Sequence, residues 1–366
     1  MSDPKPEQVG PPIALLAGLS HRCPLRCGYC SNPLELTRAS AELDTDDWCR
    51  VMREAGALGV LQVHFSGGEP TVRQDLEQLI ACARDCDLYT NLITSGVLLD
   101  APRIDALYRA GLDHVQLSVQ GSEGKGADLI GGYVGGHAKK LEVARLVRDR
   151  GIMLTLNAVV HRRNLHQVDA LFELALTLDA HRIEIASVQY NGWARRNLAA
   201  LLPTQDQLED LTKTLEAARI RLLGRLVIDF VPPDYYAARP KPCMNGWGRQ
   251  FITINPAGLV LPCHSAETIP GMTFDSVLQS PLEDIWYRGE AFSRFRGTDW
   301  MQEPCRSCEF REQDFGGCRC QALAVSGDVT ATDPVCEFSQ DRAKIDALIA
   351  AAVAEPDAPY LYRGGT

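Results

Sequence analysis

Three cysteines, Cys23, Cys27 and Cys30, lie together directly after an apolar run at 13–19. This run predicts a strand of a parallel sheet, so the thiols are expected on one loop at its carboxyl end, where barrel enzymes carry their chemistry. A four-iron cluster ordinarily takes four cysteines, and three would leave one iron open to a substrate, as in a catalytic zinc site. The alternative is a zinc knuckle or unrelated buried thiols, although zinc sites more often pair Cys-x2-Cys with histidine.

A second set of cysteines begins after residue 242. It comprises Cys243, Cys263, Cys305, Cys308, Cys318, Cys320 and Cys336. The chain has 13 cysteines, and an odd number clustered at short spacings favours metal ligation over disulfides. Cys49, Cys82 and Cys86 lie outside both sets. Cys82 and Cys86 share a helix face, which could suit a metal, but we expect all three to be small apolar packing residues.

The composition excludes several classes of function. With 366 residues, 45% hydrophobic and 23% charged, the chain has the length of about two globular domains. A net charge of −10 argues against nucleic acid as a partner. No apolar run approaches the roughly 20 residues of a membrane span. Residues 1–12 are polar and proline-rich, and the apolar run behind them is too short for a secretory signal, so a cytoplasmic location is expected.

Short β-rich runs alternate with amphipathic helical patterns as far as residue 231. Strands are expected at 13–19, 61–66, 88–94, 114–120, 152–160, 182–190 and 225–231. Helices are expected near 45–58, 73–86, 100–110, 137–150, 165–179 and 204–222, with N-cap signals at Thr45 and at Thr204 with Gln207. Strict alternation predicts a parallel sheet, and the lack of a dinucleotide-binding fingerprint favours an open or partial barrel.

The character of the sequence changes near 231–242, where a proline- and aromatic-rich stretch leads into turn-rich sequence. We therefore expect three parts. They are a barrel over 1–231, a metal-binding domain over 232–340, and a helix with a loosely held tail over 341–366.

The first motif, Cys-x3-Cys-x-aromatic-Cys with Tyr29 in the aromatic position, resembles that of the radical S-adenosylmethionine superfamily. The resemblance implies an α/β fold with a partial (β/α)6 TIM-like barrel and a [4Fe–4S] cluster on the three cysteines. It also implies that the amino and carboxylate groups of S-adenosylmethionine chelate the open iron.

Further cofactor contacts are implied by the same resemblance. Besides Tyr29, they are Gly67, Gly68 and Glu69 of a GGEP segment after the second strand, and Ser118 and Asn157 at later strand ends. In the family, the GGEP segment holds the methionine amino group. Taken singly, the segment could be a plain turn, and each strand-end residue could be a satisfied polar cap.

The second cysteine set resembles the SPASM extension of peptide-modifying radical enzymes, which binds two auxiliary iron–sulfur clusters. Asp314 stands where that family has a cysteine, and seven cysteines with Asp314 make eight ligands, four for each cluster. Carried over by position, the inner cluster takes Cys243, Cys263, Cys318 and Cys320, and the outer one takes Cys305, Cys308, Asp314 and Cys336. One cluster is expected to be [2Fe–2S] and the other [4Fe–4S]. In the alternative, Asp314 only caps the turn at 315–317.

Four stretches resemble one group of SPASM enzymes, which acts in pyrroloquinoline quinone biosynthesis. They are 29–36, 189–194, 201–204 and 305–322. The resemblance implies an oxidoreductase that forms a carbon–carbon bond between a glutamate and a tyrosine of a small precursor peptide. It also implies a small peptide-binding chaperone and a flavodoxin-like electron donor. Tyr190, Trp193 and Arg195 are the peptide contacts we expect, unless the aromatic pair packs in the core.

Two other interpretations remain open on the sequence. The nearest is another SPASM peptide modifier, sulfatase-activating or thioether-forming, with the same cofactors and a different substrate. The other is a non-catalytic iron–sulfur electron carrier or a zinc-bound scaffold, which would make no 5′-deoxyadenosine.

Overall fold

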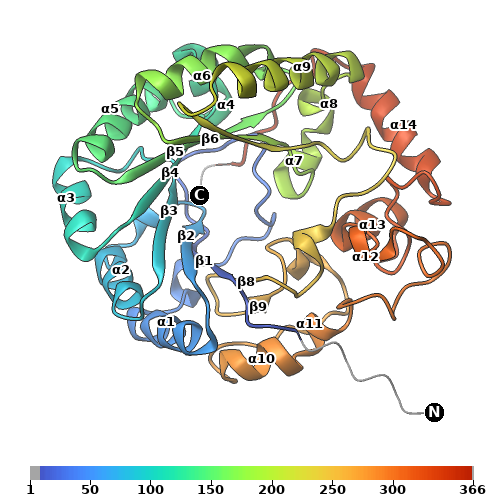
Figure 1. Ribbon diagram of the computed structural model, residues 1–366, viewed down its shortest axis with the longest axis horizontal. Coiled ribbons are helices and arrows are strands. Elements are labelled where there is room, and N and C mark those ends of the chain that lie inside the picture. The colour runs from blue at the N-terminus through green and yellow to red at the C-terminus, as the bar shows by residue number, and fades with distance from the viewer. Residues whose placement is uncertain (1–8, 365–366) are drawn as a thin grey trace.

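The computed structural model describes residues 9–364, and its framework is a curved parallel sheet (Figure 1). Its parallel strands are β1 (Ala14–Ser20), β2 (Gln62–Gly67), β3 (Tyr89–Thr94), β4 (His114–Val119), β5 (Met153–Val160), β6 (Arg182–Ser187) and β7 (Val227–Val231). Each pairs with the next in chain order, from β7 at one side to β1. The prediction of an α/β fold with an open parallel barrel is confirmed.

Helices cover the outer face of this sheet (Figure 1). They are α1 (Thr45–Leu58), α2 (Leu76–Arg84), α3 (Ala101–Ala110), α5 (Gly136–Asp149), α6 (Val168–Thr177) and α9 (Gln205–Arg221). Thr204 and Gln207 form a reciprocal capping box at the start of α9, as expected. Helix α1 begins at Thr45, but its capping residue is Asp44, whose side chain accepts from the Asp47 N–H.

The sheet separates an apolar outer face from a polar inner face. In β4, Val115, Leu117 and Val119 are buried against the helices, whereas the alternate residues Gln116 and Ser118 are only partly buried. Because successive side chains of a strand point to opposite sides, this pattern places the polar residues inside the barrel.

Several short elements were not expected from the sequence. They are α4 (Gly124–Gly131), α7 (Gly192–Arg196), α8 (Leu198–Leu201), η1 (Ala39–Ala41) and η2 (Pro70–Val72). The helix expected near 165–179 begins as η3 (Leu165–Gln167) and continues as α6. Helix α4 contains three glycines, which lower helix propensity, and α7 and α8 span too few residues to show a helical period.

The cysteine-rich part contains short elements joined by turns. They are η4 (Cys243–Asn245), β8 (Phe251–Ile254), β9 (Val260–Leu261), η5 (Ala266–Thr268), α10 (Leu282–Arg288), α11 (Glu290–Ser293), α12 (Arg311–Asp314), α13 (Arg319–Ser326) and α14 (Arg342–Val353). Strand β7 ends at Val231, where we expected the barrel to end. However, β8 pairs in parallel with β1 and extends the barrel sheet, with Ala14 opposite Phe251.

The prediction for the three remaining cysteines is wrong in part. Cys49 of α1 and Cys82 of α2 form a disulfide, while Cys86 is a free, half-buried thiol. Helices α1 and α2 pack side by side and bring the two Cα atoms to 5.5 Å, within the usual range for a disulfide. The 33-residue separation of this pair gives no signal of it in the sequence.

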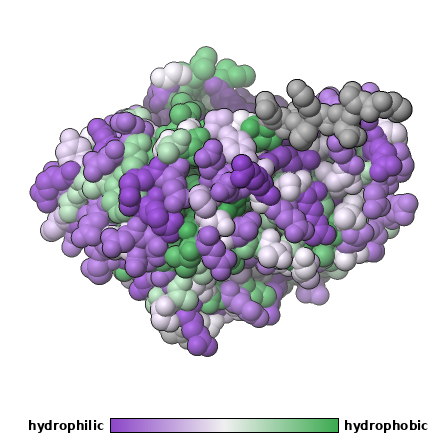
Figure 2. Space-filling model, turned by 90° about the horizontal axis from the view of Figure 1, so that it is seen from below, coloured by the Kyte–Doolittle hydropathy of each residue, from purple (hydrophilic) through white to green (hydrophobic). Residues whose placement is uncertain are grey.

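The face shown in Figure 2 is mostly hydrophilic, with smaller apolar areas between the polar residues. Within residues 9–364, none of the helices combines the length and the apolar character that crossing a membrane requires.

Candidate active site and metal centres

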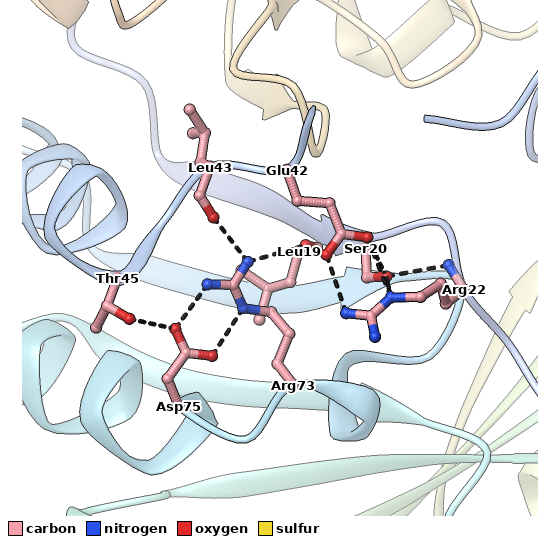
Figure 3. Close-up of polar contacts among 8 residues, drawn as sticks. All are labelled: Leu19, Ser20, Arg22, Glu42, Leu43, Thr45, Arg73 and Asp75. Atoms are coloured by element: carbon pink, nitrogen blue, oxygen red, sulfur yellow. Dashed lines mark hydrogen bonds and ion pairs between the residues drawn. The ribbon is translucent and has the colours of Figure 1, made fainter. Parts of the chain in front are cut away.

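The segment that carries the first three cysteines begins at the end of β1, and the buried side chain of Arg73 fixes its base (Figure 3). One guanidinium nitrogen donates to the carbonyl oxygens of Leu43 at 2.8 Å and Leu19 at 3.5 Å. The others form a two-point ion pair with Asp75, at 2.6 and 2.9 Å. Since the cation is 7% exposed and fully paired, it ties β1 to two neighbouring segments.

Ser20 and Glu42 hold the next residues of the segment (Figure 3). The Ser20 hydroxyl donates to a Glu42 carboxylate oxygen at 2.6 Å and accepts from the backbone N–H of Arg22 at 3.0 Å. The Arg22 guanidinium pairs with the other Glu42 oxygen at 3.0 Å. The start of the cysteine loop is therefore fixed by both backbone and side-chain contacts.

Glycine is required where the end of β2 passes the cysteine loop. A Cβ on Gly68 would lie 2.6 Å from the backbone oxygens of His21 and Arg22. At Gly67, φ is +129° and a Cβ would lie 2.3 Å from the Ser20 oxygen. The GGEP segment therefore touches the cysteine loop backbone to backbone, and only glycine permits this approach.

The Glu69 carboxylate lies behind the cavity wall. Its Oε1 accepts from the Thr71 N–H at 3.2 Å, from the Thr71 hydroxyl at 2.7 Å and from the Thr94 hydroxyl at 2.6 Å. Its Oε2 accepts from the N–H of Ser95 at 2.8 Å and from the Ser95 hydroxyl. In this structure Glu69 thus positions Thr94 and Ser95, which do line the cavity.

We predict that Glu69→Gln destabilises the protein by about 3 kcal/mol, because an amide NH2 in place of an oxygen would face buried donors and leave them unpaired. The measurement is the free energy of unfolding in urea under anaerobic conditions. Glu216→Gln on the exposed face of α9 is the control, expected to change it by less than about 0.5 kcal/mol. Equal effects of the two substitutions would contradict this role of Glu69.

A cavity of about 470 Å³ lies at the carboxyl ends of the strands, and Cys23, Cys27 and Cys30 form part of its wall. Of the expected cofactor contacts, Tyr29, Gly67, Gly68, Ser118 and Asn157 line it, and Glu69 does not. On the opposite side, Asn157 donates to a carboxylate oxygen of Glu184 at 2.8 Å. The structure thus brings the three cysteines and five of the six predicted contacts around one space.

The pKa values of all three thiols of this loop are raised, so in the absence of a bound metal the thiols keep their protons at neutral pH. Burial raises the pKa of Cys23 to about 12, and the nearby Glu69 carboxylate acts in the same direction. Burial also raises the pKa of Cys27, to about 11, and that of Cys30. Since a metal is bound by thiolates, loading this loop must release protons. Three free, half-buried cysteines facing one cavity are a donor set suited to an iron–sulfur cluster.

The expectation of a loosely held C-terminal tail is wrong as far as residue 364, and residues 365 and 366 lie outside the described part of the chain. Residues 356–364 return from α14 to the cysteine loop, toward the middle of the barrel (Figure 1). Arg363 donates to the carbonyl oxygens of Cys23 and Leu25, both at 3.0 Å. The Asn197 amide donates to the carbonyl oxygens of Gly28 and Leu361 at 3.0 and 2.9 Å. These contacts join segments distant in sequence, so no local pattern predicts them.

His161 is completely buried between this tail and the cysteine loop, with its ring 6.0 Å from that of Tyr29 and 6.2 Å from that of Tyr360. Burial lowers the pKa of His161 to about 3, so the folded protein holds this ring neutral. The unfolded chain binds a proton here below about pH 6.5. Stability is therefore lost as the pH falls from 6.5 toward 3.

We predict that His161→Gln removes about 2 kcal/mol of the stability lost between pH 7.5 and pH 5. The measurement is the free energy of unfolding in urea at both pH values. His166→Gln, an exposed histidine of the same turn, should leave the pH dependence as it is in the unmodified protein. An unchanged pH dependence in His161→Gln would contradict the prediction.

The four cysteines assigned to the inner cluster meet in one buried group. The thiols of Cys243 and Cys320 each lie within hydrogen-bonding reach of the sulfurs of Cys263 and Cys318. These contacts hold the pKa values of Cys263 and Cys318 well below the usual range and raise those of Cys243 and Cys320. Four adjacent thiols, from η4, from the loop after β9 and from the start of α13, are a suitable set of ligands for an iron–sulfur cluster.

The four residues assigned to the outer cluster also lie together. Cys305, Cys308, Asp314 and Cys336 line one small pocket. Asp314 Oδ1 accepts from the Gly316 N–H at 2.8 Å, so the turn-capping role considered from the sequence is present. The carboxylate has a second oxygen, and one residue can therefore both cap the turn and face the pocket.

Within residues 9–364, no three His, Cys, Asp or Glu side chains converge on the position of a single metal ion. The fit of these sites to clusters therefore rests on their donor chemistry. Gln189 and His264 line both the large cavity and the pocket around Cys243, Cys263 and Cys318. They form the wall between the first cysteine loop and the inner cysteine group.

The expected peptide contacts have separate positions. Trp193 lines the large cavity. The ring of Tyr190 packs against that of Tyr235 in a tilted arrangement, with centroids 4.8 Å apart, and Arg195 donates to the Ala324 carbonyl oxygen at 2.7 Å. Tyr190 and Arg195 line the pocket beside the inner cysteines. Of the three, only Trp193 faces the large cavity.

Sequence reasoning missed cavity residues outside the motifs. Glu184, Glu267 and Arg363 all line the cavity. Glu184 could have been found, because it lies in a predicted strand two residues from Ala186, on the face that points into the barrel. Glu267 lies in the three-residue helix η5 and Arg363 in the irregular C-terminal segment, and neither stretch has a periodic signal.

Comparisons with known proteins identify both parts of the chain. The pattern of the Radical SAM superfamily matches residues 19–175, and that of the SPASM iron–sulfur cluster-binding domain matches residues 243–309. The PqqA peptide cyclase of Rhodopseudomonas palustris is 59% identical over 98% of this chain and 97% of its own length. That of Methylorubrum extorquens is 54% identical over 98% of this chain and 94% of its own.

Solved structures share the fold at low sequence identity. Streptococcus suis SuiB bound to its precursor peptide SuiA has a TM-score of 0.72, with 21% identity, over 89% of this chain and 76% of its own. The protein anSMEcpe with bound AdoMet has a TM-score of 0.63, with 15% identity, over 95% of this chain and 100% of its own.

Proposed function

Since this chain belongs to the PqqA peptide cyclases of the radical SAM superfamily, we propose that it joins a glutamate and a tyrosine side chain of the PqqA peptide by a carbon–carbon bond. The observation that carries the proposal is the large cavity. Its wall contains Cys23, Cys27 and Cys30 at one side and reaches His264, beside the inner cysteine group, at the other.

In this proposal Cys23, Cys27 and Cys30 hold a [4Fe–4S] cluster with one iron open. That cluster, with S-adenosylmethionine and one electron, supplies a 5′-deoxyadenosyl radical. The backbone of Gly67 and Gly68 and the side chains of Ser118 and Asn157 bind and orient the cofactor, while Tyr29 supports the cysteine loop. Glu69 acts on the cofactor through Thr94 and Ser95, which it holds in place.

The reaction on the peptide is balanced as follows. A hydrogen atom leaves the γ-carbon of the glutamate for the 5′-deoxyadenosyl radical, and the resulting carbon radical adds to the tyrosine ring beside the hydroxyl. The adduct would then lose one proton and pass one electron to an auxiliary cluster, which would restore the aromatic ring. We assign an inner cluster to Cys243, Cys263, Cys318 and Cys320 and an outer one to Cys305, Cys308, Asp314 and Cys336, of [2Fe–2S] and [4Fe–4S] type.

The partners in this proposal are the PqqA precursor peptide, a small peptide-binding chaperone and a flavodoxin-like electron donor in the cytoplasm. Trp193 is the aromatic residue placed to contact the peptide, because it lines the cavity. Tyr190 and Arg195 lie beside the inner cysteines, and we propose that they contact the part of the peptide nearest that group.

The test is anaerobic incubation of the reconstituted protein with reductant, S-adenosylmethionine, PqqA and the chaperone. Expected products are 5′-deoxyadenosine and a peptide lighter by two hydrogen atoms, with fragment masses that place the cross-link between glutamate and tyrosine. An unchanged peptide mass would overturn the substrate assignment. The same loss of two hydrogens with a thioether linkage would favour the other type of SPASM modifier.

A further inference from the structure

Lys140 is a lysine in an unusual place. It lies on α5, is 2% exposed, and its ammonium donates to Gln120 Oε1. Within residues 9–364, this is its only hydrogen bond and no carboxylate pairs with it. Lysine is almost never buried unless it is paired, because removing an ammonium from water is costly. The negative groups that act on this ammonium are the carboxylates of Glu69 and Asp128 and the cysteines of the first loop, none of which pairs with it directly.

A chain of hydrogen bonds leads from Lys140 to the first cysteine loop. Gln120 Nε2 donates to the Tyr29 hydroxyl at 2.8 Å, and Tyr29 in turn hydrogen-bonds to Cys27. The direction of the chain is fixed, because an ammonium can only donate and therefore faces the amide oxygen of Gln120. The Gln120 NH2 must then donate to Tyr29, whose own hydrogen is left for the Cys27 sulfur.

The nearest carboxylates, Asp128 and Glu69, hydrogen-bond to other groups and act on Lys140 only through space. Asp128 accepts from the backbone N–H groups of Gly135 at 2.6 Å and His137 at 2.8 Å. Both carboxylate oxygens of Glu69 accept hydrogen bonds, from Thr71, Thr94 and Ser95. The chain of hydrogen bonds from Lys140 ends at the Cys27 sulfur. Hydrogen bonds in series polarise one another, so the positive charge acts on this sulfur through Gln120 and Tyr29.

We propose that Lys140, acting through Gln120 and Tyr29, is the counter-charge of the cluster held by Cys23, Cys27 and Cys30 and favours its reduced state. This inference rests on the function proposed above. Reduction by one electron from flavodoxin or dithionite adds one negative charge to that cluster, and a buried ammonium favours the more negative state. Hydrogen bonds to cluster sulfurs and nearby charge are recognised determinants of such potentials. Lys140 does not contact the cluster directly and acts on it through Gln120 and Tyr29, so it is a positioning residue and not a catalytic one.

The test is the reduction potential of the first cluster in the full-length reconstituted protein, followed by the EPR signal that changes on addition of S-adenosylmethionine. Lys140→Met keeps the length of the side chain and removes its charge. We expect at least a tenfold decrease in the equilibrium constant for reduction, which is about 59 mV toward more negative potential. The potentials of the auxiliary clusters should stay unchanged.

Lys139→Met is the matched control. Lys139 is the preceding residue of α5, reaches the surface and pairs with Glu142 at 3.0 Å. Its substitution should leave the potential of the first cluster unchanged. Tyr29→Phe removes the last two hydrogen bonds of the chain, from Gln120 to Tyr29 and from Tyr29 to Cys27, and should shift the potential in the same direction as Lys140→Met. The double variant should shift it by less than the sum, because both changes interrupt one chain.

Each other outcome has a defined meaning. An unchanged potential in Lys140→Met, an equal shift in Lys139→Met, or fully additive shifts would overturn the inference while leaving the proposed function intact. If Lys140→Met does not take up the cluster, the test is the reduction potential of the first cluster in Tyr29→Phe. An unchanged potential in that variant overturns the inference. If the unmodified protein shows no EPR signal that responds to S-adenosylmethionine, both the proposed function and this inference fail.

Discussion

Replacement of Cys23, Cys27 and Cys30 together by alanine is expected to reduce the formation of 5′-deoxyadenosine to background. These are the cysteines that line the large cavity, and no other free cysteine of residues 9–364 lies in its wall. The two downstream cysteine groups belong to other elements and should keep their iron and their EPR signals. The measurements are 5′-deoxyadenosine by chromatography, iron and sulfide content, and EPR of the reduced protein.

Cys86→Ala is the matched control for this triple variant. Cys86 is a free thiol at the end of α2, outside the three cysteine groups and the Cys49–Cys82 disulfide. Its replacement should leave both iron content and 5′-deoxyadenosine unchanged. Continued cleavage of S-adenosylmethionine by the triple variant would show that the radical is generated elsewhere.

Asp314→Ala is expected to alter the outer cluster. Radical formation should continue in this variant, whereas formation of the cross-linked peptide should decrease. Asp314 is the one oxygen donor among three cysteines, and a carboxylate is a harder and more labile ligand for iron than a thiolate. Its removal should change the EPR signal of this cluster and decrease the ratio of cross-linked peptide to 5′-deoxyadenosine by roughly tenfold or more. The first cluster should still cleave S-adenosylmethionine.

Asp314→Asn distinguishes metal binding from turn capping. The amide oxygen of asparagine can still accept from the Gly316 N–H, whereas the negative charge is lost. If Asp314 binds iron, both variants should change the spectrum of the outer cluster. An unchanged spectrum in both would leave capping as its role. Glu312→Ala, on the exposed face of the same short helix, should have no effect.

Much of the barrel could be predicted because its signals are local. Strand alternation places Gln116 and Ser118 on the inner face of β4, and the residues Thr204 and Gln207 define the start of α9. The three cysteine groups could be predicted for the same reason. Their members are close in sequence or match a known spacing, and the structure brings each group together.

The features that the sequence did not predict depend on contacts between distant segments. The Cys49–Cys82 disulfide requires the packing of α1 against α2, and the seat of Arg363 on Cys23 joins residues 340 positions apart. The Glu69 carboxylate points away from the cavity because its hydrogen-bond donors, Thr94 and Ser95, lie at the carboxyl end of β3. Lys139 and Lys140 are adjacent and identical in type, so the sequence does not show which of them is buried. Only the packing of α5 in the structure does.

The pairing of β8 with β1 limits how this protein can be divided into fragments. A barrel fragment that ends at Val231 would lack the strand that covers the free edge of β1, four residues of which pair with β8. An unpaired edge in a buried parallel sheet promotes aggregation and weakens the strand that leads into the cysteine loop. The contribution of the C-terminal metal sites is therefore better measured with point variants in the whole chain than by truncation.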